Sequence, residues 1–412
     1  MKMDFFKENR KRLLEILPDN SICILFSGKP VQKSADETYP FTPNRNFYYL
    51  TGISQENCIL ILSRTNKKNK EYLWVEPNNP ALARWVGEKI TPEEASKASG
   101  ITVVKLMDTF EETLHQELSA LPYPEVFIDL ERRSYKDVVS FTQYFAQSIA
   151  QKYPYIRIQN AYSMICNLRL VKTPGEVEKI RKAIDITHRG LTRIANHCAP
   201  GLKEYELEAH FDFELKASGI TDHAFRTIAA GGINASILHY NDNKWELTDG
   251  DLVLLDLGAQ FEFYNADITR TLPVNGKFSP RQKELYQMVL DTQLEVIEKI
   301  KPGVPFASLN DCCKGKLCQC ATKNGLIKDD SQLGEYYFHG VSHFLGLDTH
   351  DVGKSEELRP GMVITVEPGL YLREERLGIR IEDDILVTES GHENLSKKIP
   401  KTIKEVEHWM EK

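Results

Sequence analysis

The sequence predicts two domains: an α/β domain with a mixed sheet over residues 1–168, and an α+β domain over residues 169–412. The 412 residues are enough to build two separate hydrophobic cores. In the first part, short runs rich in Ile, Val, Leu and Tyr alternate with helical stretches, which is typical of α/β domains. In the second part, helices dominate before a strand-rich run that begins near residue 361, and this segregation is typical of α+β domains.

The first domain is expected to begin with an amphipathic helix over residues 1–17, which has neither the apolar core nor the cleavage site of a signal peptide. Residues 134–153 predict another helix. The domain contains no glycine-rich phosphate loop, which argues against a nucleotide site. The predicted strands are SICILFSG (21–28), NCILILS (57–63), EYLWVEP (71–77), ITVVKLM (101–107), EVFIDLE (125–131) and PYIRIQ (154–159).

A boundary is expected near residue 170, where the second domain begins with a helix. Thr173, Pro174 and Glu176 form a T-x-x-E capping box with proline at the first helical position, and Pro200-Gly201 ends this helix. The remaining predicted elements are helices over 203–219, 279–300 and 309–323, strands over 362–372 and 378–388, and a surface helix in the tail, 397–412.

Composition and net charge argue against two classes of protein, those that bind nucleic acid and those that span a membrane. The formal net charge of −7 gives no sign of a nucleic-acid-binding surface. No window approaches the 18 apolar residues of a membrane span. We therefore expect a cytoplasmic protein that binds neither nucleic acid nor membrane.

Four of the eight cysteines cluster between residues 309 and 323. A metal or redox cluster is one interpretation, but the run has no C-x-x-C pair and no histidine nearby. If this run is a helix, three of the four cysteines share a face with two leucines, so we favour small buried hydrophobes with reduced thiols. The face comprises Leu309, Cys312, Cys313, Leu317 and Cys320, and the fourth cysteine is Cys318.

The run VLLDLGAQFEFYNADITRT, residues 253–271, carries two aspartates where a buried strand is expected. A hairpin that turns at Phe261-Glu262 would place Asp256 and Asp267 opposite each other, with Cβ atoms roughly 5 Å apart. Two carboxylates that close would need a cation between them. The alternative is two unrelated aspartates, one at a strand end and one in a turn.

The segment YYFHGVSHFLGLDTHDVG supplies His339, His343 and His350 within twelve residues. The first two have the spacing of a zinc-binding helix. Gly340 and Val341 argue against a regular helix, however, and no glutamate follows His339 as a zincin motif requires. The alternative for each histidine is a hydrogen-bonded core residue.

Two further carboxylates end or follow apolar strands. Glu367 precedes Pro368, which holds it in an extended conformation. Because side chains alternate along a strand, Arg380 and Glu382 are expected to face the site, while Ile379 and Ile381 face the core. The next two residues, Asp383 and Asp384, are interpreted as a solvated edge.

Together these residues make an oxygen-rich set of four carboxylates and one imidazole, with room for two ions. Structural zinc sites favour thiolates and histidines, so Mn²⁺, Co²⁺ or Fe²⁺ is expected instead. Two ions roughly 3.5–4 Å apart can share a bridging hydroxide and polarise a substrate carbonyl.

The order Asp, Asp, His in HGVSHFLG, Glu in VEPG and Glu in IRIEDD resembles the pita-bread metallopeptidases. Within them the sequence is most similar to the aminopeptidase P (Xaa-Pro aminopeptidase) and prolidase group. ADETYPFTPNRNFYYLTGI (35–53) resembles the N-terminal domain of that group, although Lys33 stands where many relatives have arginine. ILHYNDN, DLVLLDLG, ADITRTLPVNGKFS and LGLDTHDVG resemble its catalytic domain.

The resemblance implies a role for each residue of the site. Two divalent ions, with Mn²⁺ favoured and Co²⁺, Fe²⁺ or Zn²⁺ as alternatives, would be bridged by Asp267 and Glu382. Glu367 would also move a proton from the attacking water to the leaving nitrogen, and His350 would hydrogen-bond the scissile carbonyl. The implied metal ligands are Asp256, Asp267, His343, Glu367 and Glu382, and the implied catalytic and substrate-binding residues are Glu367, His350, His239, His339, Tyr371 and Arg380.

The implied reaction is removal of an N-terminal residue that precedes proline. Prolidase, which cleaves only Xaa-Pro dipeptides, shares the ligands and stays open as an alternative. Methionine aminopeptidases typically lack this N-terminal domain, creatinase-type hydrolases lack this metal set, and a non-catalytic binding protein should have lost ligands. Relatives form homodimers or homotetramers, and Trp85 resembles a tryptophan that they lend to a neighbouring subunit's cleft.

Overall fold

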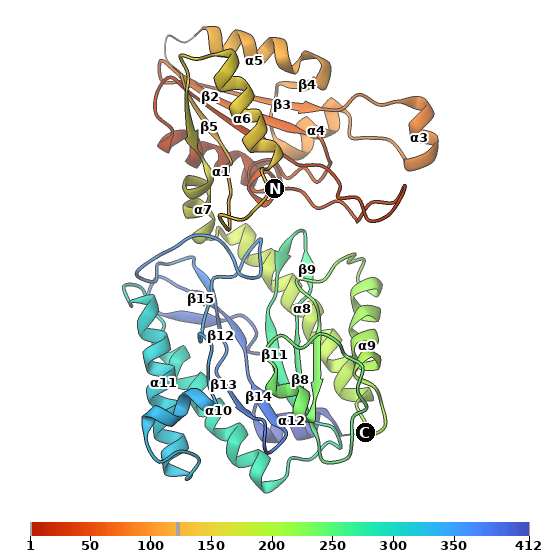
Figure 1. Cartoon of the computed structure of the whole chain (residues 1–412), viewed down its shortest axis with the longest axis vertical. Coiled ribbons are helices and arrows are strands. Elements are labelled where there is room, and N and C mark those ends of the chain that lie inside the picture. The colour runs from red at the N-terminus through yellow and green to blue at the C-terminus, as the bar shows by residue number, and fades with distance from the viewer. Residues whose placement is uncertain (1, 121–123, 412) are drawn as a thin grey trace. The chain divides into compact units, whose positions relative to one another are not determined.

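The computed structural model describes residues 2–120 and 124–411. The chain divides into two compact units, Met1–Arg169 and Leu170–Lys412 (Figure 1). None of the helices in the described ranges is long and apolar enough to cross a membrane.

The first unit is built on a mixed six-stranded sheet, which confirms the predicted α/β class. Its first strand pairs antiparallel with the second and parallel with the fifth. In sheet order the strands are β4 (Val104–Leu106), β3 (Lys68–Val75), β2 (Ile59–Thr65), β1 (Ser21–Phe26), β5 (Glu125–Ile128) and β6 (Arg157–Asn160).

Helices cover both faces of this sheet (Figure 1). Alternate residues of β1, such as Ile22 and Ile24, face a core formed with α5 and α6, because strand side chains alternate between faces. The helix predicted over 134–153 begins only at Phe141, where Ser140 caps it through a capping box that our prediction overlooked. The helices are α1 (Lys2–Ile16), α2 (Arg45–Thr51), α3 (Pro80–Val86), α4 (Pro92–Ser99), η1 (Met107–Thr109), α5 (Phe110–Ser119), α6 (Phe141–Lys152) and α7 (Tyr162–Leu170).

The second unit is α+β, as predicted. It has a three-stranded sheet in the order β11-β8-β7, a second in the order β12-β15-β16, and the two-stranded pairs β9-β10 and β13-β14. The strands are β7 (Ile228–Gly231), β8 (Leu252–Leu257), β9 (Gln260–Phe261), β10 (Tyr264–Asn265), β11 (Ile268–Pro273), β12 (Val363–Val366), β13 (Gly369–Leu372), β14 (Leu377–Arg380), β15 (Asp383–Val387) and β16 (His392–Asn394).

Two helices of the second unit begin where their capping residues predict, whereas the helix predicted over 309–323 begins three residues earlier, at Phe306. Thr173 and Ser279 each close a capping box, followed by proline at the first helical position. Helices α8 and α9 pack against each other, and so do α10 and α11. The helices are α8 (Pro174–His197), α9 (Glu204–Ala217), η2 (Gly232–Ser236), α10 (Pro280–Glu298), α11 (Phe306–Lys323), η3 (Asp330–Glu335) and α12 (Ile403–Trp409).

The cysteine cluster lies on α11 as predicted, but its buried face differs in detail. Leu309, Cys313 and Leu317 are buried, as expected. Cys318 is also buried, whereas Cys312 and Cys320 are only half-buried. All four thiols are free, so in the described structure they act as packing residues of this helix.

Candidate metal centre

Asp256 and Asp267 lie on one hairpin, but its register differs from the predicted one. The antiparallel strands β8 and β11 place Asp256 opposite Thr269 rather than opposite Asp267. The turn falls at Glu262-Phe263, both with positive φ (47° and 66°), one residue later than predicted. Because residues two apart share a strand face, Asp267 still lies diagonally across from Asp256. Burial and the neighbouring Asp256 raise the pKa of Asp267 well above its usual value.

His343 joins these aspartates from an irregular segment between η3 and β12. No helix forms around His339 and His343, in agreement with the doubt that Gly340 and Val341 raised. His343 Nδ1 lies 3.1 Å from the Phe344 carbonyl, which leaves Nε2 free to bind a metal. Nε2 lies 3.4 Å from Asp267 Oδ2 and 3.5 Å from Glu367 Oε1.

Glu367 and Glu382 complete the group from the ends of strands β12 and β14. Ligand atoms of Asp267, His343 and Glu382 all lie within 4.8 Å of one another. Burial raises the pKa of Glu367 to about 7, and burial together with Asp267 raises the pKa of Glu382 well above its usual value. We call Asp256, Asp267, His343, Glu367 and Glu382 the acidic cluster.

Arg380 supports the acidic cluster from one side. Its guanidinium is buried and donates to Asp256 Oδ2 at 2.6 Å, Tyr371 Oη at 3.0 Å and Thr269 Oγ1 at 3.2 Å. Thr269 Oγ1 in turn donates to Glu382 Oε2 at 2.7 Å. Arg380 therefore fixes one oxygen of Asp256, whereas the other oxygen, Oδ1, is buried without a hydrogen-bond partner.

The donor set of the acidic cluster fits divalent cations. An orphaned buried carboxylate oxygen costs free energy unless something binds it. Buried carboxylates with raised pKa values repel one another, and a cation would stabilise their ionised forms. Four carboxylates with one imidazole nitrogen are ligands that Mn²⁺, Co²⁺, Fe²⁺ and Zn²⁺ accept.

Three further histidines lie beside the acidic cluster. His339 Nε2 lies 2.9 Å from Tyr371 Oη, and burial, with a smaller effect of Arg380, lowers the pKa of His339 to about 4. His350 packs edge-on against His343 with ring centroids 4.4 Å apart, and burial lowers its pKa as well. His239 is exposed and lies close enough to the rings of His339 and His350 to contribute to the lowering of both pKa values.

Comparison with known proteins identifies the family. The model of the aminopeptidase P N-terminal domain matches residues 6–127, and the model of metallopeptidase family M24 matches residues 178–389. The chain belongs to metallopeptidase family M24. It is 34% identical to an Xaa-Pro aminopeptidase of Haemophilus influenzae, with 98% of this chain and 96% of that protein covered.

Solved structures agree over the full length of this M24 metallopeptidase. A structure from Bacillus anthracis that is assigned as an aminopeptidase P matches with 50% identity and a TM-score of 0.97, covering 100% of this chain and 98% of that one. Zinc-substituted aminopeptidase P from Escherichia coli, in complex with product, matches with 32% identity and a TM-score of 0.91 over the same shares. The predicted two-domain pita-bread fold and the hydrolase class are confirmed, and a divalent-metal site belongs to this family.

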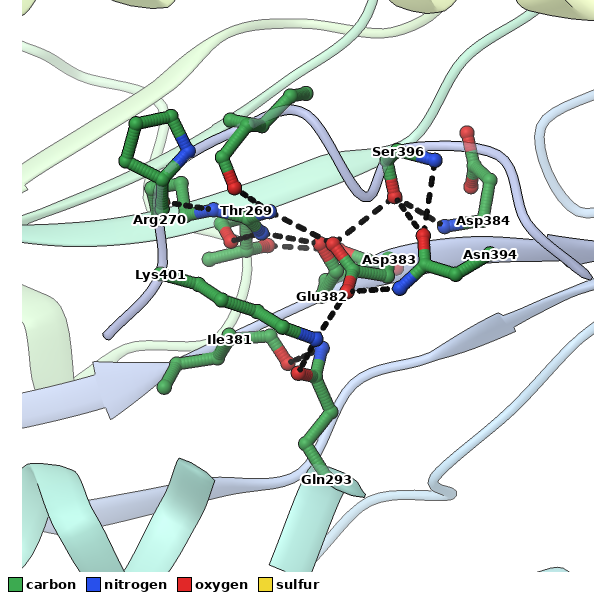
Figure 2. A network of polar contacts seen from close by, with 12 residues as sticks. Thr269, Arg270, Gln293, Ile381, Glu382, Asp383, Asp384, Asn394, Ser396 and Lys401 are labelled. Atoms are coloured by element: carbon green, nitrogen blue, oxygen red, sulfur yellow. Dashed lines mark hydrogen bonds and ion pairs between the residues drawn. The ribbon is translucent and has the colours of Figure 1, made fainter. Parts of the chain in front are cut away.

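Next to Glu382 of the acidic cluster, this M24 metallopeptidase has a second polar network, which the sequence did not reveal (Figure 2). The interpretation of Asp383 and Asp384 as a solvated edge is wrong, because both are fully buried. Asp383 accepts from Arg270 at 2.7 Å and from Lys401 at 2.6 Å. Burial alone would raise the pKa of Asp383, but these two cations hold it well below its usual value. Both cations are far from Asp383 in sequence, so only an acid-rich run was visible.

Two other buried charges position segments near the site, and sequence reasoning missed both. Glu204, fully buried at the start of α9, accepts four hydrogen bonds from the 231–245 segment that carries His239. Lys172 pairs with Asp351 at 2.9 Å, and both side chains are 1% exposed. Asp351 follows His350 directly, so this ion pair holds the segment that presents that imidazole. Lys172 gave a sequence signal, as a charged residue at the end of the run LRLV, whereas Glu204 lies among other charged residues and gave none.

Proposed function

We propose that this chain is a metal-dependent exopeptidase that removes the N-terminal residue from peptides with proline in second position. The convergence of the acidic cluster from three distant parts of the chain carries the proposal. Full-length similarity to Xaa-Pro aminopeptidases supports the substrate class.

The acidic cluster would hold two divalent ions. Asp256, Asp267, His343, Glu367 and Glu382 are the proposed ligands, with Asp267 and Glu382 shared between the ions, and we favour Mn²⁺ over Co²⁺, Fe²⁺ or Zn²⁺. When bound, the ions would supply an activated water and polarise the scissile carbonyl.

The chain's own residues would then handle protons and orientation. Glu367 lies at the edge of the cluster next to His343, where it can take a proton from the attacking water and pass it to the leaving proline nitrogen. His350, kept neutral by its lowered pKa, can donate a hydrogen bond to the carbonyl oxygen as charge develops there. Arg380 would orient Asp256 and Tyr371 through the hydrogen bonds described above.

Selectivity for proline would come from the rings beside the cluster. A proline nitrogen carries no N–H and its ring fixes φ, so a site that binds a secondary amide would hold it poorly. His239, His339 and Tyr371 can instead contact the flat faces of the pyrrolidine ring.

A peptide series tests the proposal. The metal-loaded protein should cleave Xaa-Pro-Yaa and longer peptides, and it should leave Xaa-Ala-Yaa peptides of equal length intact. Cleavage of Xaa-Pro dipeptides alone would favour prolidase, whereas equal cleavage of both series or of neither would refute the proposal. Asp267→Ala should lose bound metal and activity together, which a non-catalytic binding protein would not do.

We also propose a cytoplasmic homodimer or homotetramer. Helix α3 has no buried residue within the chain, and Trp85 on it is 87% exposed. An indole this exposed would bury substantial apolar area against a second copy. Light scattering of wild type and Trp85→Ala should show an oligomer that the substitution weakens, and a monomeric wild type would exclude it.

A further inference from the structure

Gln293 links the two strand ends that carry Glu367 and Glu382. It is fully buried on α10, and its Nε2 donates to the Val366 carbonyl at 3.2 Å and to the Ile381 carbonyl at 3.1 Å. Val366 directly precedes Glu367, and Ile381 directly precedes Glu382. One side-chain amide therefore bridges the peptide groups next to two of the proposed ligands. Figure 2 shows Gln293 with two of its partners, Ile381 and Lys401.

The orientation of this amide is determined by its partners. Gln293 Oε1 lies 2.8 Å from Lys401 Nζ, which can only donate, while the two carbonyls can only accept. The amide oxygen must therefore face Lys401, and both N–H groups are used by the two strand ends. Lys401 is held in turn by Asp383 at 2.6 Å, so the amide has one satisfied arrangement.

The bridge lies where the backbone ladder stops. The last pair between β12 and β15 is Val366 with Asp383. Pairing of the same two segments resumes only at Gly369 with Arg380, in β13 and β14. Between the two ladders the segments share one long hydrogen bond of 3.3 Å, from Ile381 N to the Pro368 carbonyl. Glu367 and Glu382 lie in this interruption, and their own amides donate to Val341 and Thr269, so the Gln293 amide ties the two segments together there.

We propose that Gln293 is a positioning residue that sets the spacing of Glu367 and Glu382 and thereby the affinity for divalent ions. The inference rests on the proposed function, since it takes these glutamates as metal ligands. Side chains that orient ligands from behind typically account for a 10–100-fold range in metal affinity or activity. Lys401 contributes by fixing the amide orientation from the C-terminal segment.

The test compares two buried glutamines of the same helix. Gln293→Met keeps the side-chain volume and removes the bridge. Gln282→Met is the matched control, because Gln282 is also buried and donates to the Gly250 carbonyl at 2.8 Å, away from the glutamates. Gln293→Asn keeps the amide but is one methylene too short to reach both carbonyls, and it serves if the methionine variant does not fold. Mn²⁺ affinity of the full chain is measured by calorimetry after chelation.

We expect Gln293→Met and Gln293→Asn to weaken Mn²⁺ binding by about 10-fold or more, with Gln282→Met within about twofold of wild type. At saturating Mn²⁺, kcat for an Xaa-Pro peptide should fall in the Gln293 variants while KM changes little. Equal Mn²⁺ affinities in the Gln293 and Gln282 variants would overturn the inference. If the wild type cleaves no Xaa-Pro peptide but the affinity contrast holds, the proposed function fails and the positioning role stands.

Discussion

Replacing Arg270 by methionine should destabilise the second unit strongly, because this buried arginine satisfies several groups at once. Arg270 is fully buried and makes five hydrogen bonds, to the carbonyls of Thr269, Glu382, Ile399 and Pro400 and to the Asp383 carboxylate. Methionine would fill most of the volume but supply no donor.

The expected loss of unfolding free energy follows from the groups that lose their partner when Arg270 is replaced. Removing one partner of a buried ion pair costs about 3–5 kcal/mol, because the remaining charge loses its compensation. Lys401 still faces Asp383, which limits the loss, while each abandoned carbonyl adds a cost of about 1–3 kcal/mol where water cannot reach it. We expect a net loss of at least about 4 kcal/mol, a large share of the ~5–15 kcal/mol that stabilises a typical protein.

The loss should shrink on acidification. In wild type the pKa of Asp383 lies below its unfolded value, so its ionisation stabilises the fold above about pH 4, and this contribution is lost as the pH falls through the folded pKa. Without Arg270 the pKa of Asp383 rises, so protonation removes the uncompensated charge at a higher pH. The difference between variant and wild type should therefore be smaller at about pH 5 than at neutral pH.

Denaturant unfolding of the chelated full chain, followed by circular dichroism at both pH values, measures this effect. Arg281→Met is the control: Arg281 lies on α10, is 37% exposed and pairs with Glu375 at the surface. Its loss should cost about 0–1 kcal/mol at either pH. If Arg270→Met shifts the midpoint no more than Arg281→Met, the account of this network is wrong.

Three further predictions concern buried charges. In protein freed of metal by a chelator, Asp267→Asn should raise the melting temperature, because it removes a like charge. It should also abolish the stabilisation that Mn²⁺ gives wild type, which is about 2.7 kcal/mol at 100 times Kd. Equal shifts of the melting temperature with Mn²⁺ in both proteins would contradict this. Glu204→Gln should cost about 1–3 kcal/mol and raise KM, because an N–H would face a donor in the 231–245 segment; unchanged melting and KM would refute it. Lys172→Met should cost about 3–5 kcal/mol in denaturant unfolding by removing the buried cation that pairs with Asp351, and a loss under about 1 kcal/mol would exclude that role.

Elements with strong local signals could be predicted from the sequence. Thr173-Pro174 and Ser279-Pro280 determine where helices begin through local hydrogen bonds and a fixed φ, so their signals lie within a few residues. The strands of the first unit were visible because β1, β2 and β5 are rich in β-branched or aromatic residues and β3 ends in the run YLWV. The cap at Ser140 carries the same signal, and its Gln143 partner would have corrected the start of that helix.

The hairpin register could not be predicted for a physical reason. Its turn places Glu262 and Phe263 at positive φ, a conformation that normally selects glycine or asparagine. Tertiary contacts override this preference: Lys179 Nζ lies 3.5 Å from a carboxylate oxygen of Glu262. The local sequence therefore does not mark this turn, and the contact with Lys179 on α8 lies far away in the chain. As a result the turn was predicted one residue early, and Asp256 was paired with Asp267 instead of Thr269.

The polar networks were invisible because their partners are distant in sequence. Asp383 meets Arg270 and Lys401 across 113 and 18 residues, respectively. Gln293 lies in a helix, and a polar residue in a helix is ordinarily predicted to be exposed to solvent. Only the folded chain shows that Asp383, Arg270 and Gln293 are buried and that they find hydrogen-bond partners in distant segments.

Asp383 and the buried carboxylates of the acidic cluster are compensated in two different ways. Asp383 is compensated permanently by cations of the chain itself, so it can stay ionised without a ligand. No lysine or arginine within the described part of the chain forms an ion pair with Asp267, Glu367 or Glu382, and each of them has a raised pKa. Protons could neutralise them one at a time, but a carboxylic O–H occupies a single lone pair, whereas one divalent ion binds several lone pairs together with the free nitrogen of His343. The chain therefore neutralises Asp383 with its own lysine and arginine side chains, and it leaves the negative charges of Asp267, Glu367 and Glu382 to be neutralised by a metal ion.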